Sequence, residues 1–310
     1  MRRDYPDDLR REQPDRPNPS RAGRGDPDAS VVGGTDPRDV FTRDLDLPRG
    51  DTRERVFVHT RSYELRGSEA RTLATVGAFR VVPDADLREH DRPSSADLRH
   101  LRDLGLVRTV PHVIGKTRTS LVTLTERGRD VLEVARRDQE RNGSQTFYAG
   151  ISKPRELTHD AHLYRAYCRA SERLVARGAR IRRIVLDDEL KGAYQRFLQE
   201  SNRGRRDGNG RPDRHADEIA EWAVANHLPM RDDHVQFPDV RVEYDDRDGR
   251  PGIEDLEVLT PHYRGAHAAG KASSGFTCYR AIGARLGGGS GSGHGGGRGF
   301  DPRVAEEFLG

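Results

Sequence analysis

The chain has 310 residues, of which 33% are hydrophobic and 34% are charged, with a formal net charge of +3 at pH 7. This polarity is too high for a single core through the whole length, so we expect compact domains joined to disordered segments. No run of about 18 apolar residues occurs, which excludes a membrane-spanning helix. The two distant cysteines, Cys168 and Cys278, exclude a disulfide scaffold and a paired-cysteine zinc site.

Four of the 54 basic residues are lysine and the rest are arginine. The planar guanidinium group suits phosphates and base edges. Codon usage in a GC-rich genome would produce the same excess, so only the local distribution of charge is informative.

Composition divides the chain into four parts. Residues 1–55 predict a disordered tail, and residues 284–310 a glycine-rich tail. Between them, residues 56–145 and 155–283 carry the apolar periodicity of ordered domains. The first residues lack the apolar stretch of a secretory signal, so we expect a cytoplasmic protein.

The first ordered block predicts helices and then a strand hairpin. One helix is expected after Ser68, a short one from Asp84, and a third capped by Ser94 or Ser95. In the third helix Leu98, Leu101 and Leu104 would point inward, and Asp97, Arg99, His100 and Arg102 outward. Two short strands, 106–110 and 120–125, and a helix capped by Thr125 follow.

The segments DLRHLRDLGLV (97–107) and LTERGRDVLE (124–133) resemble winged-helix DNA-binding domains. In such domains one helix enters the major groove and the hairpin approaches phosphates. Between residues 99 and 120 the sequence has five basic residues and a single acidic residue, Asp103. The predicted DNA-binding residues are Arg99, His100, Arg102, Arg108, Lys116 and Arg118. A winged helix used for protein contact is the alternative.

The second block opens with a predicted helix from Thr158, on which arginines recur every four residues. Arg165, Arg169 and Arg173 would form a basic stripe that adds a second nucleic-acid surface, or else only a solvated face. His159 and His162 on the same helix lack a third metal ligand at helical spacing.

Strands are expected at 182–190, 235–244, 252–260 and 276–280, the middle two forming a hairpin. Alternation places Val240, Val242 and Tyr244 on one face of the hairpin. This order of elements, with Pro238-Asp239 and Glu257, resembles the PD-(D/E)xK nuclease superfamily. That resemblance implies Asp239 and Glu257 as ligands of a divalent metal and a lysine that assists catalysis. Leu259 occupies the usual lysine position, so Lys271 is the nearest replacement.

A narrower resemblance is to the replication-relaxation family, in which a winged helix precedes a degenerate domain of this nuclease fold. His159, Pro238-Asp239, Glu257, Lys271 and Tyr279 occur in the family's order. The resemblance implies DNA binding linked to plasmid replication, relaxation or mobilisation.

The sequence therefore predicts an α+β protein with an N-terminal winged helix-turn-helix domain, a restriction-endonuclease-like α/β domain and disordered termini. We expect a non-catalytic DNA-binding protein without a cofactor. The alternatives are a metal-dependent endonuclease that uses Mg²⁺ with Asp239, Glu257 and Lys271, and a winged-helix transcriptional regulator. Expected partners are double-stranded DNA and no membrane, with a homodimer and plasmid replication or mobilisation proteins left open.

Overall fold

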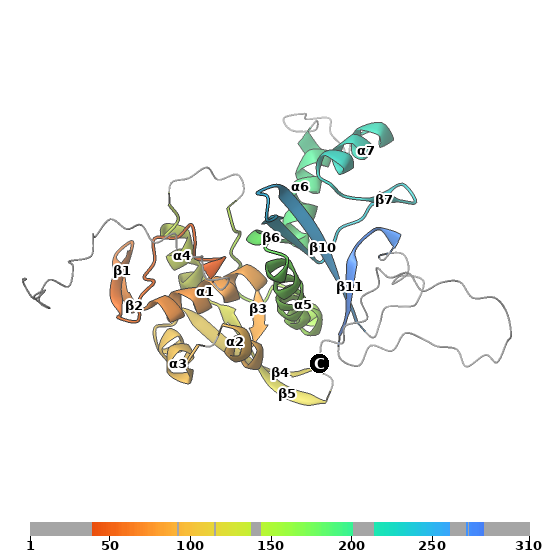
Figure 1. The fold of residues 1–310 in the computed structure, drawn as a ribbon. Coiled ribbons are helices and arrows are strands. Elements are labelled where there is room, and N and C mark those ends of the chain that lie inside the picture. Colours follow the sequence, from red (N-terminus) through yellow and green to blue (C-terminus); the bar gives the residue numbers. More distant parts are fainter. Residues whose placement is uncertain are drawn as a thin grey trace, which may run out of the picture. The chain divides into compact units, whose positions relative to one another are not determined.

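The computed structural model describes residues 39–91, 93–114, 116–137, 144–200, 214–260, 271 and 273–281 (Figure 1). These residues belong to one compact unit with an α+β fold. The expected tail residues 1–38 and the glycine-rich tail 284–310 lie outside the described residues. Among the described residues, no helix combines the length and apolar character that crossing a membrane requires.

The fold begins earlier than the sequence predicts. Val40, Phe41, Leu45 and Leu47 are buried in the main core, and strand β1 (Glu54–Val58) pairs antiparallel with β2 (Arg61–Leu65). The expected tail boundary at residue 55 is therefore wrong. The four apolar side chains have no helical or strand period, and they are stabilised by packing against distant elements, which a local pattern does not reveal.

Four helices and a three-stranded sheet form the next part. The elements are α1 (Gly67–Phe79), β3 (Val81–Pro83), α2 (Asp84–His90), α3 (Ser95–Asp103), β4 (Val107–Ile114), β5 (Thr117–Leu124) and α4 (Glu126–Val134), with sheet order β3-β5-β4. Ser94 caps α3 and Thr125 caps α4 as predicted, each through its side-chain oxygen. Helix α1 starts one residue before Ser68, because Glu69 accepts the backbone N–H of Arg66.

A four-stranded sheet covered by a long helix follows. The elements are the short 3-10 turn η2 (Pro154–Glu156), α5 (Leu157–Ala176), β6 (Arg180–Leu186), α6 (Asp187–Gln199), α7 (Ala216–Ala225), β7 (Met230–Arg231), β8 (His234–Val235), β9 (Val240–Asp245), β10 (Pro251–Leu259) and β11 (Thr277–Arg280). The sheet order is β11-β10-β9-β6; β10 and β11 are parallel and the other pairs antiparallel. Helix α5 packs against this sheet (Figure 1).

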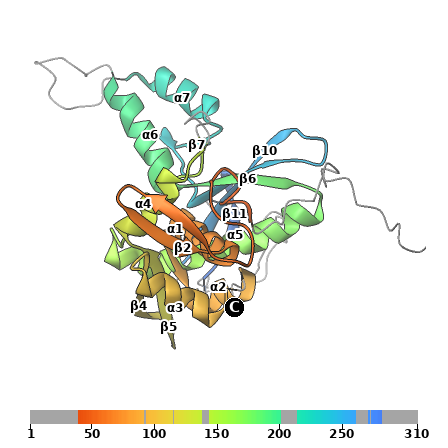
Figure 2. The same cartoon turned by 90° about the vertical axis from the view of Figure 1, so that its left-hand side faces the viewer.

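The strand predicted at 182–190 ends at Leu186. Asp187, Asp188 and Glu189 form the acidic first turn of α6, where carboxylates interact favourably with the helix dipole. Helices α6 and α7 lie side by side (Figure 2), and Trp222 of α7 packs on Tyr194 and Phe197 of α6.

The two ordered blocks share one core. Phe79 of α1 packs on Tyr164 and Tyr167 of α5, with ring centroids 5.2 and 5.1 Å apart, and Phe41 contacts both Phe79 and Tyr167. The boundary expected between residues 145 and 155 therefore does not separate two independent cores.

Strand β6 is an edge of the four-stranded sheet, and the side chain of Gln145 lies along it. The Gln145 amide accepts the backbone N–H of Ile184 at 3.0 Å and donates to the Ile184 carbonyl at 3.2 Å. Arg183, which also belongs to β6, donates a side-chain hydrogen bond to the carbonyl of Ser144. The chain before α5 thus occupies hydrogen-bonding groups at this edge.

Candidate functional site

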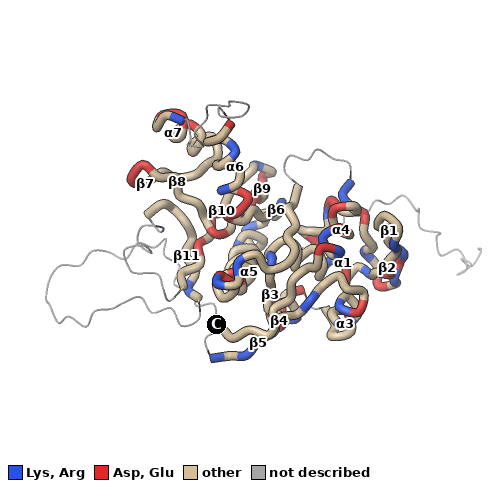
Figure 3. Tube along the Cα trace, turned by 180° about the vertical axis from the view of Figure 1, so that it is seen from behind, with Lys and Arg blue, Asp and Glu red and all other residues tan. Residues whose placement is uncertain are grey.

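Five of the six predicted DNA-binding residues form an exposed basic surface on α3 and the β4–β5 hairpin. Figure 3 shows blue segments on α3 and at the tip of the hairpin. Among the described residues, none of the five has a carboxylate oxygen within ion-pair distance. We call these residues the basic surface: Arg99, Arg102, Arg108, Lys116 and Arg118.

The sixth residue, His100, does not belong to this surface. Its Nδ1 lies 2.9 Å from Oε1 of Glu69, a fully buried carboxylate on α1. Asp97, also expected to face outward, is buried and accepts hydrogen bonds from Arg66 and Ser94. The outward assignments of His100 and Asp97 are therefore wrong, because α3 docks on α1 through polar contacts as well as through its leucines.

The predicted arginine stripe on α5 is smaller than expected. Arg165 donates at 2.7 Å to Asp86, whose burial raises its pKa despite that contact. Arg173 bonds to the Tyr279 hydroxyl and Glu254. Only Arg169 of the three is exposed, at 3.9 Å from Glu172. Arg165 thus binds α5 to α2, and Arg173 binds it to β10 and β11. Because both side chains are paired, they add little to a nucleic-acid surface.

Asp239, the first predicted metal ligand, is held by two donors. Its Oδ2 accepts the backbone N–H of Val258 at 2.8 Å and lies 3.0 Å from Nε2 of His159 on α5. Burial alone would lower the pKa of His159, but hydrogen bonds with Asp160 and Asp239 outweigh it and raise this pKa to about 10. His159 is therefore a cation at neutral pH and forms an ion pair with Asp239.

Glu257, the second predicted ligand, is fully buried and paired with Lys271. The Lys271 ammonium lies 3.3 Å from both Glu257 oxygens and donates to the Phe237 carbonyl at 2.8 Å. Burial raises the pKa of the neighbouring Cys278 thiol to about 12; Glu257 and Asp239 add to this rise and Lys271 opposes it. The structure thus brings the predicted lysine to the predicted glutamate.

Both predicted metal ligands have a cationic side chain beside them, His159 beside Asp239 and Lys271 beside Glu257. Among the residues that the structure describes, no three His, Cys, Asp or Glu side chains converge as a metal-binding group. Leu259, at the usual lysine position, is buried.

A buried charge cluster around Arg80 was not predicted from the sequence. Arg80, between α1 and β3, contacts Asp160 at 3.5 Å, Asp187 at 2.6 Å and Asp188 at 3.1 Å. It is 5% exposed and adopts a positive φ of 64°. The signal in the sequence was a lone arginine within the apolar run Ala78–Pro83, where a buried charge needs a partner.

His162 lies one turn after His159 and is fully buried. Neither of its ring nitrogens has a hydrogen-bond partner among the described residues. Burial, with added repulsion from Arg165 and His159, lowers the pKa of His162 to about 4. It is a neutral core residue at pH 7.

The geometry therefore presents one exposed basic surface and one buried set of acids that are neutralised within the chain. A scan against protein-family models and searches of curated proteins and of solved structures gave no significant match.

Proposed function

We propose that this protein binds double-stranded DNA through the basic surface on α3 and the β4–β5 hairpin. The observation that carries the proposal is that five cations are exposed there without an ion-pair partner among the described residues. Elsewhere many arginines are paired with acids, as Arg80 and Arg165 are. Unpaired surface cations keep their charge available for DNA phosphates.

We propose that these helices and the hairpin act as a winged helix, which would assign separate tasks to the two parts of the surface. Helix α3 would enter the major groove, where Arg99 and Arg102 on its outer face reach base edges. Arg108, Lys116 and Arg118 on the hairpin would contact phosphates. His100 has no role in this scheme, because it is bound to Glu69.

The test is duplex binding by the full chain, measured by fluorescence anisotropy across a salt series. Replacing both Lys116 and Arg118 with glutamine should weaken binding of all sequences and reduce the slope of log K against log salt by about 1.8, at about 0.9 per lost phosphate contact. Arg129→Gln is the control, because Arg129 is already paired with Glu126. Equal loss in the control and the double variant would contradict the proposal.

The four-stranded part is proposed to have a degenerate PD-(D/E)xK-like fold without nuclease activity. The ion pair of Asp239 with His159 supports this, since a metal-dependent nuclease needs that carboxylate to bind the metal ion. The contact of Lys271 with Glu257 is the one observation that favours the endonuclease alternative. We expect no nicking of supercoiled plasmid with Mg²⁺ or Mn²⁺. Nicking that Asp239→Ala and Glu257→Ala both abolish would establish the enzyme instead.

Membership of the replication-relaxation family is proposed on the same residues that suggested it. His159 and Asp239, two of those residues, form an ion pair, and Lys271 contacts Glu257. On this proposal the protein acts in plasmid or mobile-element replication, relaxation or mobilisation. A DNA footprint of the full chain on a plasmid origin or transfer origin, compared with a promoter region, would separate this role from that of a transcriptional regulator.

A further inference from the structure

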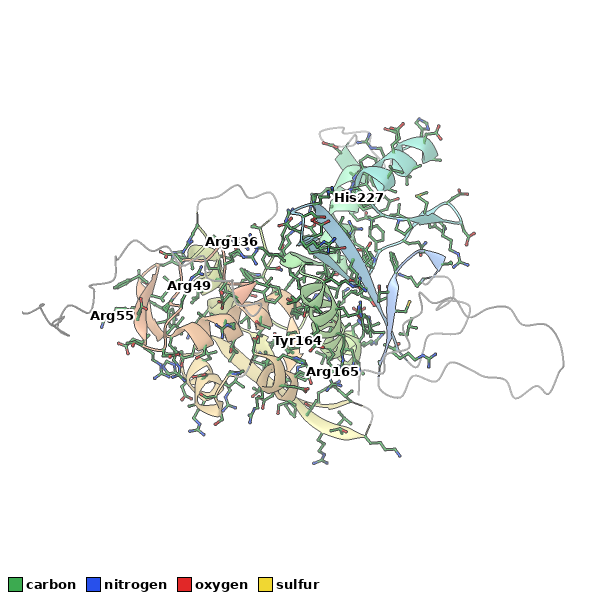
Figure 4. The ribbon with its side chains drawn as sticks, viewed as in Figure 1. Arg49, Arg55, Arg136, Tyr164, Arg165 and His227 are labelled. Carbon is green, nitrogen blue, oxygen red and sulfur yellow. The ribbon has the colours of Figure 1, made fainter. Side chains whose placement is uncertain are left out.

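A second basic site lies at the C-terminal end of α4. A cavity of about 970 Å³ is bounded by residues 46–49, by β1 and by the end of α4. Backbone hydrogen bonds hold two of these walls together, from Asp46 N–H to the Ala135 carbonyl and from Arg137 N–H to the Asp44 carbonyl. Figure 4 labels Arg49, Arg55 and Arg136, which gather here from three different segments.

The cavity is positively charged. Four arginines line it, against two acids, Asp46 and Glu54. Arg49 and Arg137 are exposed, and neither has a carboxylate partner among the described residues, although one Arg49 nitrogen donates to the Arg43 carbonyl at 2.9 Å. Arg55 lies 3.9 Å from Glu64, with both side chains largely exposed, while Arg136 is held by Glu133. At least two guanidinium groups are therefore available to an anionic ligand.

An exposed aromatic ring stands beside these arginines. Phe57 on β1 lines the cavity and is 68% exposed, although phenylalanine is usually buried. Nothing in the described fold requires the ring there, because the inward residues of the hairpin are Val58, Tyr63 and Leu65. An aromatic face next to exposed guanidinium groups is the combination that binds a base and its phosphates.

We propose that this cavity binds single-stranded nucleic acid, with a base stacked on Phe57 and adjacent phosphates on Arg49 and Arg137. A single strand fits this chemistry better than a duplex, because only an unpaired base offers its face to an aromatic side chain. A duplex presents base edges within its grooves. The site is separate from the basic surface on α3 and the hairpin, and it does not depend on the function proposed for that surface.

The experiment uses the full chain and a labelled 15-nucleotide oligothymidine, with binding followed by anisotropy at about 50 mM salt. Phe57→Leu keeps an apolar side chain but removes the π-face, and should weaken binding at least about fivefold. Phe57→Trp should retain binding. The double replacement of Arg49 and Arg137 with glutamine should lower the salt slope by about 1.4, at about 0.7 for each single-strand phosphate contact.

Arg129→Gln, on the same helix but outside the cavity, is the matched control and should bind as the parent does. No detectable binding of the oligothymidine by the parent would overturn the proposal, as would equal affinities of the parent and Phe57→Leu. Binding that is lost only when Lys116 and Arg118 are replaced would also overturn it, by locating the strand on the hairpin. Duplex affinity measured on the same variants keeps the two sites distinguishable: Phe57→Leu should leave it unchanged.

Discussion

Arg80 is held in an unfavourable backbone conformation by the carboxylates around its side chain. Its φ and ψ of 64° and −59° lie outside the regions that non-glycine residues populate readily. Such strain costs about 1–3 kcal/mol and persists only where the surroundings impose it. Here the guanidinium group joins the end of α1 to Asp160 on α5 and to Asp187 at the start of α6.

We expect Arg80→Met to lower the free energy of unfolding by about 3–5 kcal/mol, because it breaks a buried ion-pair cluster and leaves Asp160 and Asp187 with only His159 and Lys191 as cationic neighbours among the described residues. Chemical denaturation at pH 7 measures this. Arg88→Met is the control: Arg88 also pairs with an aspartate, Asp84, but its side chain is 52% exposed, so its replacement should cost about 0–1 kcal/mol. Similar losses in the two variants would contradict the importance assigned to burial.

His162 makes stability depend on pH in the acidic range. Because its pKa is about 4 in the folded protein and about 6.5 in the unfolded chain, the unfolded chain takes up its proton first as pH falls. The contribution of neutral His162 is complete above about pH 6.5 and is lost as pH falls towards 4, at about 1.4 kcal/mol per pH unit.

We therefore expect His162→Leu to weaken this acid dependence in denaturation experiments between pH 4 and 6.5. The same two proteins compared above pH 7 give the packing effect of the substitution alone, since His162 is neutral there in both states. Identical slopes of stability against pH in the acidic range for the variant and the parent would show that another group is responsible.

At the scale of elements, Gly128 determines how closely α4 approaches Leu106, the residue before β4. A Cβ built on Gly128 would lie 2.1 Å from the carbonyl oxygen of Leu106, and the Gly128 N–H binds the cap residue Thr125. The glycine of the Leu-Thr-x-x-Gly-Arg segment is thus required by close packing of backbones.

Gly128→Ala should destabilise the protein by about 1–3 kcal/mol, the usual cost of overpacking, despite the higher helix propensity of alanine. Gly192, in the interior of α6, is the matched control, because a Cβ there would meet only the flexible end of Arg196 at 3.6 Å. Gly192→Ala should therefore stabilise by about 0.5–1 kcal/mol. Thermal unfolding of both variants gives the comparison, and equal signs would refute the packing explanation.

Local chemistry predicted the elements whose signals are local. Ser94 and Thr125 were identified as caps because a cap depends on residues within one turn, and the β9–β10 hairpin followed from alternation that buries Val240 and Val242. Helix α6 was not predicted, because the acidic residues after Leu186 follow a strand without a break and were assigned to that strand.

The candidate sites divide in the same way. Exposed Arg102 and Arg118 were found by counting local charge, whereas His100 and Arg165 were misassigned because their partners, Glu69 and Asp86, are 31 and 79 residues away. Phe57 and Arg80 were not identified, since exposure and long-range ion pairing arise only when the chain is folded.

At the scale of the whole molecule, the shared core couples the two blocks. Phe41 contacts Phe79 of α1 and Tyr167 of α5, so one side chain from the segment before β1 supports both. Core residues that touch elements of both blocks should make them unfold together.

Phe41→Ala is expected to lower the free energy of unfolding by about 3–5 kcal/mol, the usual cost of truncating a buried phenylalanine. Backbone amides in α1 and α5 should lose protection from hydrogen exchange together. Phe57→Ala, which removes the exposed ring, should change stability by no more than about 0.5 kcal/mol. Continued protection of α5 while α1 exchanges would indicate two separable folding units.

The Gln145 side chain on β6 has a consequence for self-association. An edge strand with free N–H and C=O groups is a template on which a strand from another molecule can add, and such addition leads to aggregation. By occupying both backbone groups of Ile184, the Gln145 amide imitates a neighbouring strand and leaves that position unable to recruit one. A single polar side chain thus protects this edge of the sheet, and its loss would expose unpaired backbone groups at the start of the apolar sequence Ile184–Leu186.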